Sequence, residues 1–569
     1  MAYTLSRNIL KDGNITYYIN EVHRIPGTSN GRKQTKVKTF SARELIEKGV
    51  DPEEYVNAVL LSLRKEAENE NKRQLVNCTI DLDRPLEETD ADGNLIEIDD
   101  VKNLGYLFYS LLYHKLEIDE FINNRRRYLK VKKYNINVLF QHLLYSRILW
   151  PCSINKTFTY KNKFFDDAKC DIQHVYRVLD PLLKWRTPLL KHIDKQIKDK
   201  YGRRNAIIFY DVTNYYFERD ENDEGEGLRA KGVSKEHRPE PIVQMGLFMD
   251  EKGLPITYEL FRGNTNDSVT FSKAIDSSII DFSESKKIVV ADKGMMSYYN
   301  ILKIRNDRNG YVISQSIRSS NEETVEFALD PSGWICKLNN DGEVIYKMKE
   351  RIIPRSANTT GDIDDKRHSG RYNERQIFIW SKKYAERAKN ERQEDLDGYY
   401  LLCTNVIGAE SNKIRKDRPS DFAYYDDKEG FLVLNREVPA EEIDNIYGGL
   451  WKIEETFKVT KTGMLNFRPV FHSKQDRIRA HFLLCFVSLV LERLLEMNIN
   501  WEFSSKTIRE ELSSFNATQI VNTNIYQINK YNGIIKKLID TFHLNINKRC
   551  LMQSEIRKLV GDTKIKDYE

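Results

Sequence analysis

Three acidic side chains stand where a strand or a helix would hold them in place. Asp211 follows four apolar residues in IIFYDVTNYYFE (207–218), and Asp292 ends the apolar run KIVVAD. Glu454 lies in YGGLWKIEETFKVTK (447–461). An acid at the end of a buried strand is a common position for a catalytic ligand, because the sheet fixes its place. Each aspartate taken alone is equally compatible with a cap on a turn.

Carboxylates that come together repel one another unless cations neutralise them. Ligation by oxygen alone suits Mg²⁺ or Mn²⁺, and two such ions about 4 Å apart form a clamp for in-line attack on a phosphodiester. We therefore predict that Asp211, Asp292 and Glu454 are both the catalytic residues and the ligands of two Mg²⁺ or Mn²⁺ ions. Two strand aspartates and a helix glutamate are the metal-binding set of an RNase H-like nuclease or transferase.

Four more side chains share the predicted helix face of Glu454, with spacings of three and four residues: Tyr447, Trp451, Lys458 and Lys461. A neighbouring face is wholly apolar and consists of Ile446, Leu450, Ile453 and Phe457. We expect one helix that packs on the sheet by its apolar face, while its two lysines hold substrate phosphates. An ordinary amphipathic helix explains the charges as well, but it explains the aligned tyrosine and tryptophan less readily.

The surrounding sequence predicts a mixed sheet that could hold these acids. Strand-like runs occur at 207–218, 241–250, 254–263, 286–292 and 311–317, with helical patterns after the third and the fourth. Antiparallel strands followed by a helix and an interior strand indicate an α/β class. Residues from about 320 to 430 alternate short strand runs with polar loops, and helical periodicity resumes at Pro439.

A basic helical region precedes the predicted sheet. Residues 104–205 contain 21 Lys and Arg against 9 Asp and Glu, although the whole chain has a net charge of only +5. Arg125, Arg126 and Arg127 form its densest cluster. Such a block is typical of a protein that binds the phosphate backbone of DNA, and a solvated helical surface is the competing interpretation.

These patterns predict an RNase H-like mixed-sheet core with a β-rich insertion, preceded by a basic helical DNA-binding domain. The predicted regions are 1–103 (mixed α/β with an acidic connector), 104–204 (basic helical), 205–320 (first part of the core), 321–431 (β-rich insertion), 432–500 (second part of the core) and 501–569 (helical).

The chain resembles bacterial insertion-sequence transposases of the DDE class, in the insertion-sequence-four-like branch that carries the signature Y-x2-R-x3-E-x6-K. Tyr447, Glu454 and Lys461 fall on that spacing, but Leu450 occupies the arginine position, where Lys452 or Lys458 could substitute. YDVTNYYFE and VVADKGMMS resemble the strands of the first and second aspartates. The resemblance covers most of residues 105–495.

The resemblance implies a cut-and-paste DNA transposase. It would bind the terminal inverted repeats of its element, cut the ends by two-metal hydrolysis and join the 3′-hydroxyls to target DNA, acting as a homodimer in the synaptic complex. A hairpin end with an unstacked base is also implied, and Trp451 could stack on that base unless it is a core residue. His237 and Arg238 could contact phosphate, or they could form a polar turn.

Two other functions remain open at this stage. One is a domesticated, inactive transposase that only binds DNA, and the other is a structure-selective nuclease on the same fold. Strand-transfer products would separate transposition from both, because a nuclease produces only cut ends.

The remaining features predict a cytoplasmic protein, and the resemblance implies a bacterial one that associates with the nucleoid. Seven scattered cysteines without a CxxC pair predict reduced thiols. The longest apolar run, LLCFVSLVL (483–491), is too short to span a membrane, and the N-terminus lacks the apolar core of a signal peptide.

Overall fold

The structure, a computed structural model, groups the chain into two compact units. One unit comprises residues 1–96 with 521–523, and the other comprises residues 97–520 with 524–569. The described residues are 2–24, 32–71, 76–77, 79, 83, 87, 89, 100–129, 133–166, 168, 170–218, 220–233, 239–277, 286–295, 297–361, 363, 365–388, 396–461, 465, 467–521 and 523–566. Most of the predicted acidic connector lies outside these residues.

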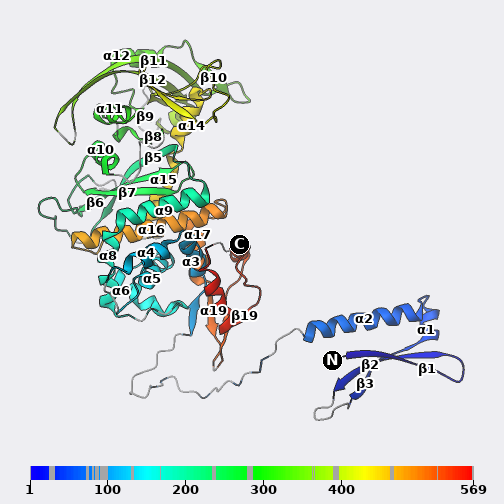
Figure 1. The fold of residues 1–569 in the computed structure, drawn as a ribbon. Helices are drawn as coiled ribbons and strands as arrows, with labels where there is room; N and C mark the ends of the chain where they lie inside the picture. Colours follow the sequence, from blue (N-terminus) through cyan, green and yellow to red (C-terminus); the bar gives the residue numbers. More distant parts are fainter. Residues whose placement is uncertain are drawn as a thin grey trace. The chain divides into compact units, whose positions relative to one another are not determined.

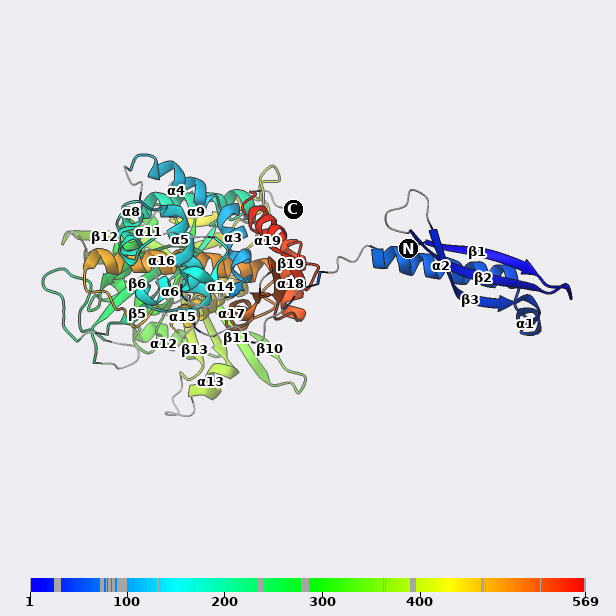
Figure 2. The same cartoon turned by 90° about the horizontal axis from the view of Figure 1, so that it is seen from below.

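The N-terminal unit is a three-stranded antiparallel sheet with two helices (Figures 1 and 2). Its elements are β1 (Ala2–Ile9), β2 (Ile15–Arg24), β3 (Arg32–Ser41), α1 (Ala42–Glu47) and α2 (Pro52–Asn71). Tyr17 and Ile19 of β2 pack with Leu45, Val56 and Leu60 of the helices to form a small core. One face of the sheet is therefore covered by helices.

The second unit is built around a nine-stranded mixed sheet, so the predicted α/β class is confirmed. Its strand order is β10-β11-β12-β13-β9-β8-β5-β6-β7. The five strands around Asp211 are β5 (Ile207–Tyr216), β6 (Ile242–Asp250), β7 (Pro255–Arg262), β8 (Ile288–Ala291) and β9 (Gly310–Gln315). β6 is antiparallel to β5 and β7, whereas β8 is parallel to β5 and β9. Parallel neighbours need crossover helices, which are α10 (Asp267–Ser277) and α11 (Tyr298–Asn306).

Most of the predicted insertion continues this sheet beyond β9. The additional strands are β10 (Ile335–Leu338), β11 (Val344–Thr360), β12 (Arg367–Ser381) and β13 (Tyr399–Thr404). Three further strands, β14 (Val406–Gly408), β15 (Ala423–Asp426) and β16 (Phe431–Leu434), form a separate small sheet. A short helix, α13 (Lys382–Ala388), follows β12.

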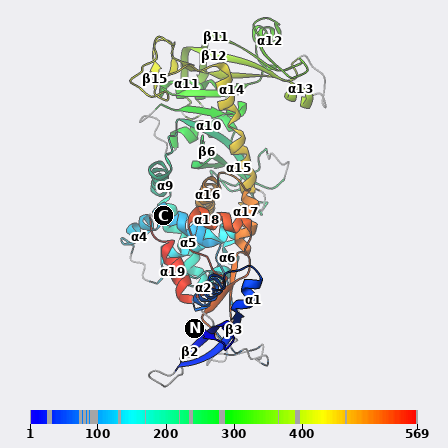
Figure 3. The same ribbon diagram turned by 90° about the vertical axis from the view of Figure 1, so that its right-hand side faces the viewer.

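Side chains alternate along the central strands, which gives the sheet two distinct apolar faces. Phe209 and Val290 belong to the face covered by α14 (Ala440–Gly448), α15 (Trp451–Lys461) and α16 (Gln475–Asn498). Tyr210 and Val289 belong to the opposite face, on which α10, α11 and α12 (Glu322–Leu329) pack. In Figure 3, α14 and α15 follow one another along the side of the sheet.

Seven helices fill the region between residues 106 and 201 and pack around α16. They are α3 (Tyr106–Lys115), α4 (Ile118–Arg126), α5 (Ile136–Leu149), α6 (Ile154–Thr159), α7 (Ile172–Arg177), α8 (Leu179–Lys184) and α9 (Arg186–Tyr201), with the 3₁₀ turn η1 (Tyr160–Lys163) after α6. The apolar run 483–491 lies in α16, where it is buried. Within the described part of the chain, no helix has the length and apolarity to cross a bilayer.

The prediction of a wholly helical C-terminal region is wrong. Besides α17 (Ser505–Ser514), α18 (Gly533–Phe542) and α19 (Gln553–Asp562), it contains β17 (Asn516–Gln519), β18 (Ile525–Ile528) and β19 (Cys550–Met552). These strands form a sheet with β4 (Val101–Asn103). Asn103 binds the end of α17, since its Nδ2 donates to the carbonyl of Leu512 at 2.8 Å. Strands of three or four residues are too short for an alternation of apolar and polar side chains to predict them.

Candidate active site

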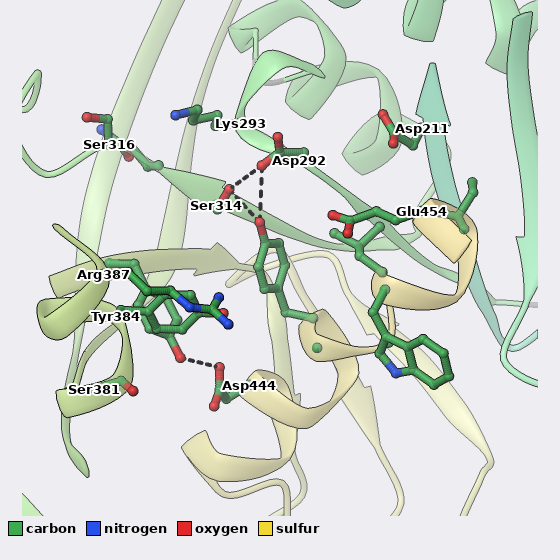
Figure 4. Close-up of a pocket in the computed structure, with 18 of the residues that line it drawn as sticks. Asp211, Asp292, Lys293, Ser314, Ser316, Ser381, Tyr384, Arg387, Asp444 and Glu454 are labelled. Atoms are coloured by element: carbon green, nitrogen blue, oxygen red, sulfur yellow. Dashed lines mark hydrogen bonds between the residues drawn. The ribbon is translucent and has the colours of Figure 1, made fainter. Parts of the chain in front are cut away.

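Asp211, Asp292 and Glu454 come from three separate elements and line one cleft with a volume of ≈ 1550 Å³. Asp211 lies in β5, Asp292 follows the last residue of β8, and Glu454 lies in the first turn of α15. The parallel register pairs Tyr210 with Ala291, so the next residue on each strand is an aspartate at the same level. Figure 4 shows the three carboxylates around a shared space in the cleft.

Asp292 belongs to a closed group of three hydrogen-bonding side chains (Figure 4). Ser314 Oγ donates to Asp292 Oδ1 at 3.1 Å. The Tyr447 hydroxyl lies 3.2 Å from the same Oδ1 and 2.8 Å from Ser314 Oγ. Burial, followed by the charge of Asp292, raises the pKa of Tyr447, so this hydroxyl remains a protonated donor. The two hydroxyls fix the orientation of the Asp292 carboxylate.

The donor set fits hard divalent cations. It consists of three carboxylates, and in the described part of the chain no lysine or arginine forms an ion pair with Asp292 or Glu454. Both carboxylates are exposed to the cleft, so they can exchange water for a ligand. Among the described residues, however, no three His, Cys, Asp or Glu side chains are gathered closely enough to hold one ion. The three carboxylates share a cleft without converging on a single point.

Basic side chains outnumber acidic ones in the cleft walls by eight to four. The basic residues are Lys293, Arg318, Lys383, Arg387, Lys452, Lys458, Lys461 and Arg468, and the acidic ones are Asp211, Asp292, Asp444 and Glu454. Arg387 and Tyr384, both from α13, lie on the opposite side of the cleft from Glu454 in Figure 4. A basic cleft with an acidic centre suits a polyanion whose backbone passes over the carboxylates.

The predicted single helix from Tyr447 to Lys461 is wrong, because it is divided into α14 and α15. The chain makes 3₁₀-type bonds at the junction, where Gly449 N donates to the carbonyl of Ile446 and Leu450 N to that of Tyr447. A Cβ on Gly449 would lie 2.4 Å from the ring of Phe209. The missing side chain of Gly449 therefore lets this junction lie close to β5. The predicted apolar face is confirmed, since Ile446, Leu450, Ile453 and Phe457 are all buried.

The residues around the signature have different surroundings. Leu450, at the family's arginine position, is 8% exposed and packs in the core. Lys452 Nζ donates to the backbone carbonyl of Glu251, so it is used within the fold. Trp451 is 57% exposed and lines the cleft, which rules out the alternative of a core tryptophan. Lys458 and Lys461 also line the cleft.

The predicted arginine cluster, 125–127, does not line this cleft. His237 and Arg238 are outside the described residues. Arg125 and Arg127 line a second pocket of ≈ 830 Å³ between α4 and α9, together with Tyr128 and Trp185. Arg126 donates to Asn135 Oδ1.

Part of the predicted basic block is neutralised within the fold. Arg203, only 1% exposed, binds Asp250 at 2.7 Å and Asp194 at 2.9 Å. Arg186 pairs with Glu259, and Lys200 pairs with Glu117. These basic side chains are structural, so the charge of the block overstates the surface available to DNA.

Ser314 and the pair Tyr346 and Tyr400 are cleft residues that the sequence did not single out. Ser314 stands on β9, next to β8, where the parallel register pairs Ala291 with Ile313. The two tyrosines donate to Asp444 at 2.7 and 2.9 Å. Their strands and α14 are distant in sequence, so no local pattern links them.

Comparison with known proteins gives one informative match. Residues 224–491 match a family model described as a transposase DDE domain. The matched range contains Asp292 and Glu454 and begins after Asp211. No curated protein matches the chain.

Solved structures similar to the chain include a piggyBac transposase synaptic complex with hairpin DNA, at 10% identity and a TM-score of 0.31. This alignment covers 85% of the present chain and 80% of the other. The family match therefore supports a DDE transposase.

Proposed function

We propose that this protein is a DNA transposase that cuts the ends of its own insertion sequence and joins the freed 3′-hydroxyls to target DNA. The observation that carries the proposal is that Asp211 inside β5, Asp292 at the end of β8 and Glu454 on α15 line one basic cleft. The strand order β7-β6-β5-β8-β9, with β6 antiparallel to its neighbours, supports an RNase H-like core.

Mg²⁺ or Mn²⁺ would be held by Asp211, Asp292 and Glu454. Two such ions, when bound, supply activation of the attacking oxygen and stabilisation of the leaving oxygen. The protein's own residues position the strand: Ser314 and Tyr447 orient Asp292, and Lys458 and Lys461 on α15 hold phosphates of the strand that passes over Glu454. The exposed ring of Trp451 can stack on a base that has left the helix at a hairpin end.

The DNA partners are the terminal inverted repeats and the target, and the synaptic complex is a homodimer acting in the bacterial nucleoid. We assign end binding to the helical region 104–204, chiefly through phosphates. Its affinity is expected to fall by roughly 10³ or more between 50 and 200 mM salt if six or more phosphates are contacted.

The test is a reaction of the purified protein and Mg²⁺ with the DNA that flanks its own gene. Nicks and joined strands are mapped by sequencing. Cleavage at both ends followed by joined products supports transposition, and chelation of the metal should abolish both. Cut ends that are never joined would indicate a nuclease, and binding without any cut would indicate an inactive DNA-binding protein.

A further inference from the structure

The N-terminal sheet has one face covered by helices and one face left open. Tyr17 and Ile19 of β2 point into the small core beneath α1 and α2. Because side chains alternate along a strand, Thr16, Tyr18 and Asn20 lie on the opposite face. In Figures 1 and 2, α2 runs along only one side of this sheet.

The open face carries hydroxyls, amides and a cation. The register pairs Ser6 of β1 with Tyr18 and Asn20 with Lys36 of β3. Asn20 Nδ2 donates to Ser6 Oγ at 2.9 Å, and Lys36 Nζ lies 4.1 Å from the centre of the Tyr18 ring. No acidic residue lies on this face among the described strand residues.

Charge is also divided between the two layers of this unit. The three strands contain six Lys and Arg residues and one acidic residue, Glu21. The two helices contain seven acidic residues and three basic ones. The strands therefore have a net charge of +5 and the helices −4. Arg7 and Lys38 are paired in register with the core residues Tyr17 and Ile19, so they lie on the helical side, whereas Lys36 lies on the open face with no acidic residue of the described strands beside it.

We propose that this open sheet face docks on double-stranded DNA, with its strands in the major groove. Three strands roughly 5 Å apart are about 10 Å across, and the groove is about 12 Å wide. Hydroxyl side chains on this face can hydrogen-bond to base edges and phosphates, and Lys36 can pair with a phosphate. Asn20 is buried and bonded to Ser6, so it supports the face without facing DNA. A second copy of the chain fits less well, because a two-fold contact would place the Lys36 faces against each other.

This inference rests on the proposed function only in taking DNA as the ligand. It adds a second DNA-binding surface to a protein whose end binding was assigned to the helical region. The unit then serves to hold DNA, and it contributes no residue to the cleavage chemistry.

Photo-crosslinking of the full chain tests which face meets DNA. p-Benzoylphenylalanine replaces either Tyr18, on the open face, or Tyr55 of α2, on the helical side. With labelled DNA that flanks the gene, we expect label transfer from position 18 and none from position 55. Crosslinking at position 55, or at neither position while the DNA is still cut, would overturn the proposal. So would crosslinking of position 18 to a second copy in the absence of DNA, or preferentially to RNA of the same sequence.

Two lysines on the same strand provide a matched pair for a binding measurement. Lys36 lies on the open face, whereas Lys38 is paired with the core residue Ile19, because the register shifts between Ile19 and Asn20. Lys36→Gln should reduce the slope of log affinity against log salt by about 0.9, the value for one lost phosphate contact. Lys38→Gln should leave the slope unchanged. Equal slopes for both variants and the unaltered protein would contradict the proposal.

Neither readout requires cleavage, which separates the two proposals. If position 18 crosslinks to DNA that is never cut, the proposed function fails and this inference stands. If the DNA is cut and joined while position 18 does not crosslink to it, this inference fails and the proposed function stands.

Discussion

At the scale of single residues, Tyr447 determines how Asp292 is presented. Its hydroxyl is one of two that contact this carboxylate, and burial keeps it protonated. Tyr447→Phe removes the hydroxyl and keeps the ring. We expect cleavage to fall by roughly 10- to 100-fold, the usual cost of losing a group that orients a metal ligand. Single-turnover cutting with saturating DNA measures this loss, and DNA affinity should not change. An unchanged cutting rate would show that Ser314 alone suffices.

A buried carboxylate in α16 makes stability depend on pH. Burial raises the pKa of Glu492 to about 8, with Glu496 adding to the effect, while Tyr109 donates to its Oε2 at 2.7 Å. The folded protein thus keeps a proton that the unfolded chain releases at about pH 4.3. The native state is consequently destabilised as pH rises from that value to about 8.

The glutamine of Glu492→Gln cannot ionise. The melting temperature of this variant minus that of the unaltered protein should therefore increase between pH 5 and pH 8. Thermal unfolding at several pH values measures the gap. Glu510→Gln, an exchange on the exposed surface of α17, should show no such trend. A gap that stays constant across this range would mean that Glu492 is already ionised in the folded protein at pH 5.

At the scale of elements, the junction between α14 and α15 sets the distance of Glu454 from β5. Gly449→Ala places a methyl group 2.4 Å from Phe209 and should force α15 away from the strand. We expect a loss of about 1–3 kcal/mol in stability and a clear fall in cutting. Gly448→Ala is the matched control, because a Cβ there meets nothing within 4 Å. Equal activity of the two variants would show that the junction can move freely.

The connection between α9 and the β6–β7 turn depends on a buried arginine. Arg203 binds Asp250, whose other oxygen accepts from the backbone of Lys252 and Leu254 in that turn. Arg203→Met leaves Asp250 buried without its cation and should lower the free energy of unfolding by about 3–5 kcal/mol.

The neighbouring Arg204, 69% exposed, pairs with Asp421. Arg204→Met should cost less than about 1 kcal/mol by chemical denaturation. Similar losses for the two variants would refute a structural role specific to Arg203.

At the scale of the whole molecule, the sequence predicted the parts with strong periodicity. The central strands and α16 have long apolar patterns, and burial confirms them. The split at Gly449 was missed because glycine inside a helical pattern is often tolerated. The sheet of β4 with β17–β19 was missed because its strands are short and its first member lies more than 400 residues from the others.

The residues of the candidate site also divide into those that the sequence could predict and those that it could not. Asp211 and Asp292 could be found because each follows an apolar strand pattern, and Glu454 because it shares a predicted helix face with aromatic and basic residues. Their neighbours Ser314, Tyr400 and Arg387 could not, because strand pairing and the position of α13 bring them to the cleft. The distribution of charge along the sequence was the least reliable predictor of DNA-binding surfaces. Arg203 contributed to a predicted DNA-binding block and is buried, whereas the open face of the N-terminal sheet has too few charges to attract notice in the sequence.

The account depends most on three carboxylates acting together on DNA. The direct measurement is cutting of the gene's flanking DNA by Asp211→Asn, Asp292→Asn and Glu454→Gln, with affinity measured in parallel by gel shift. Asp444→Asn is the control, since Asp444 lines the same cleft but is held by Tyr346 and Tyr400. We expect each of the three variants to bind DNA within a few-fold of normal and to cut none, while the control still cuts. Full cutting by any one of the three would remove that residue from the site and contradict the account.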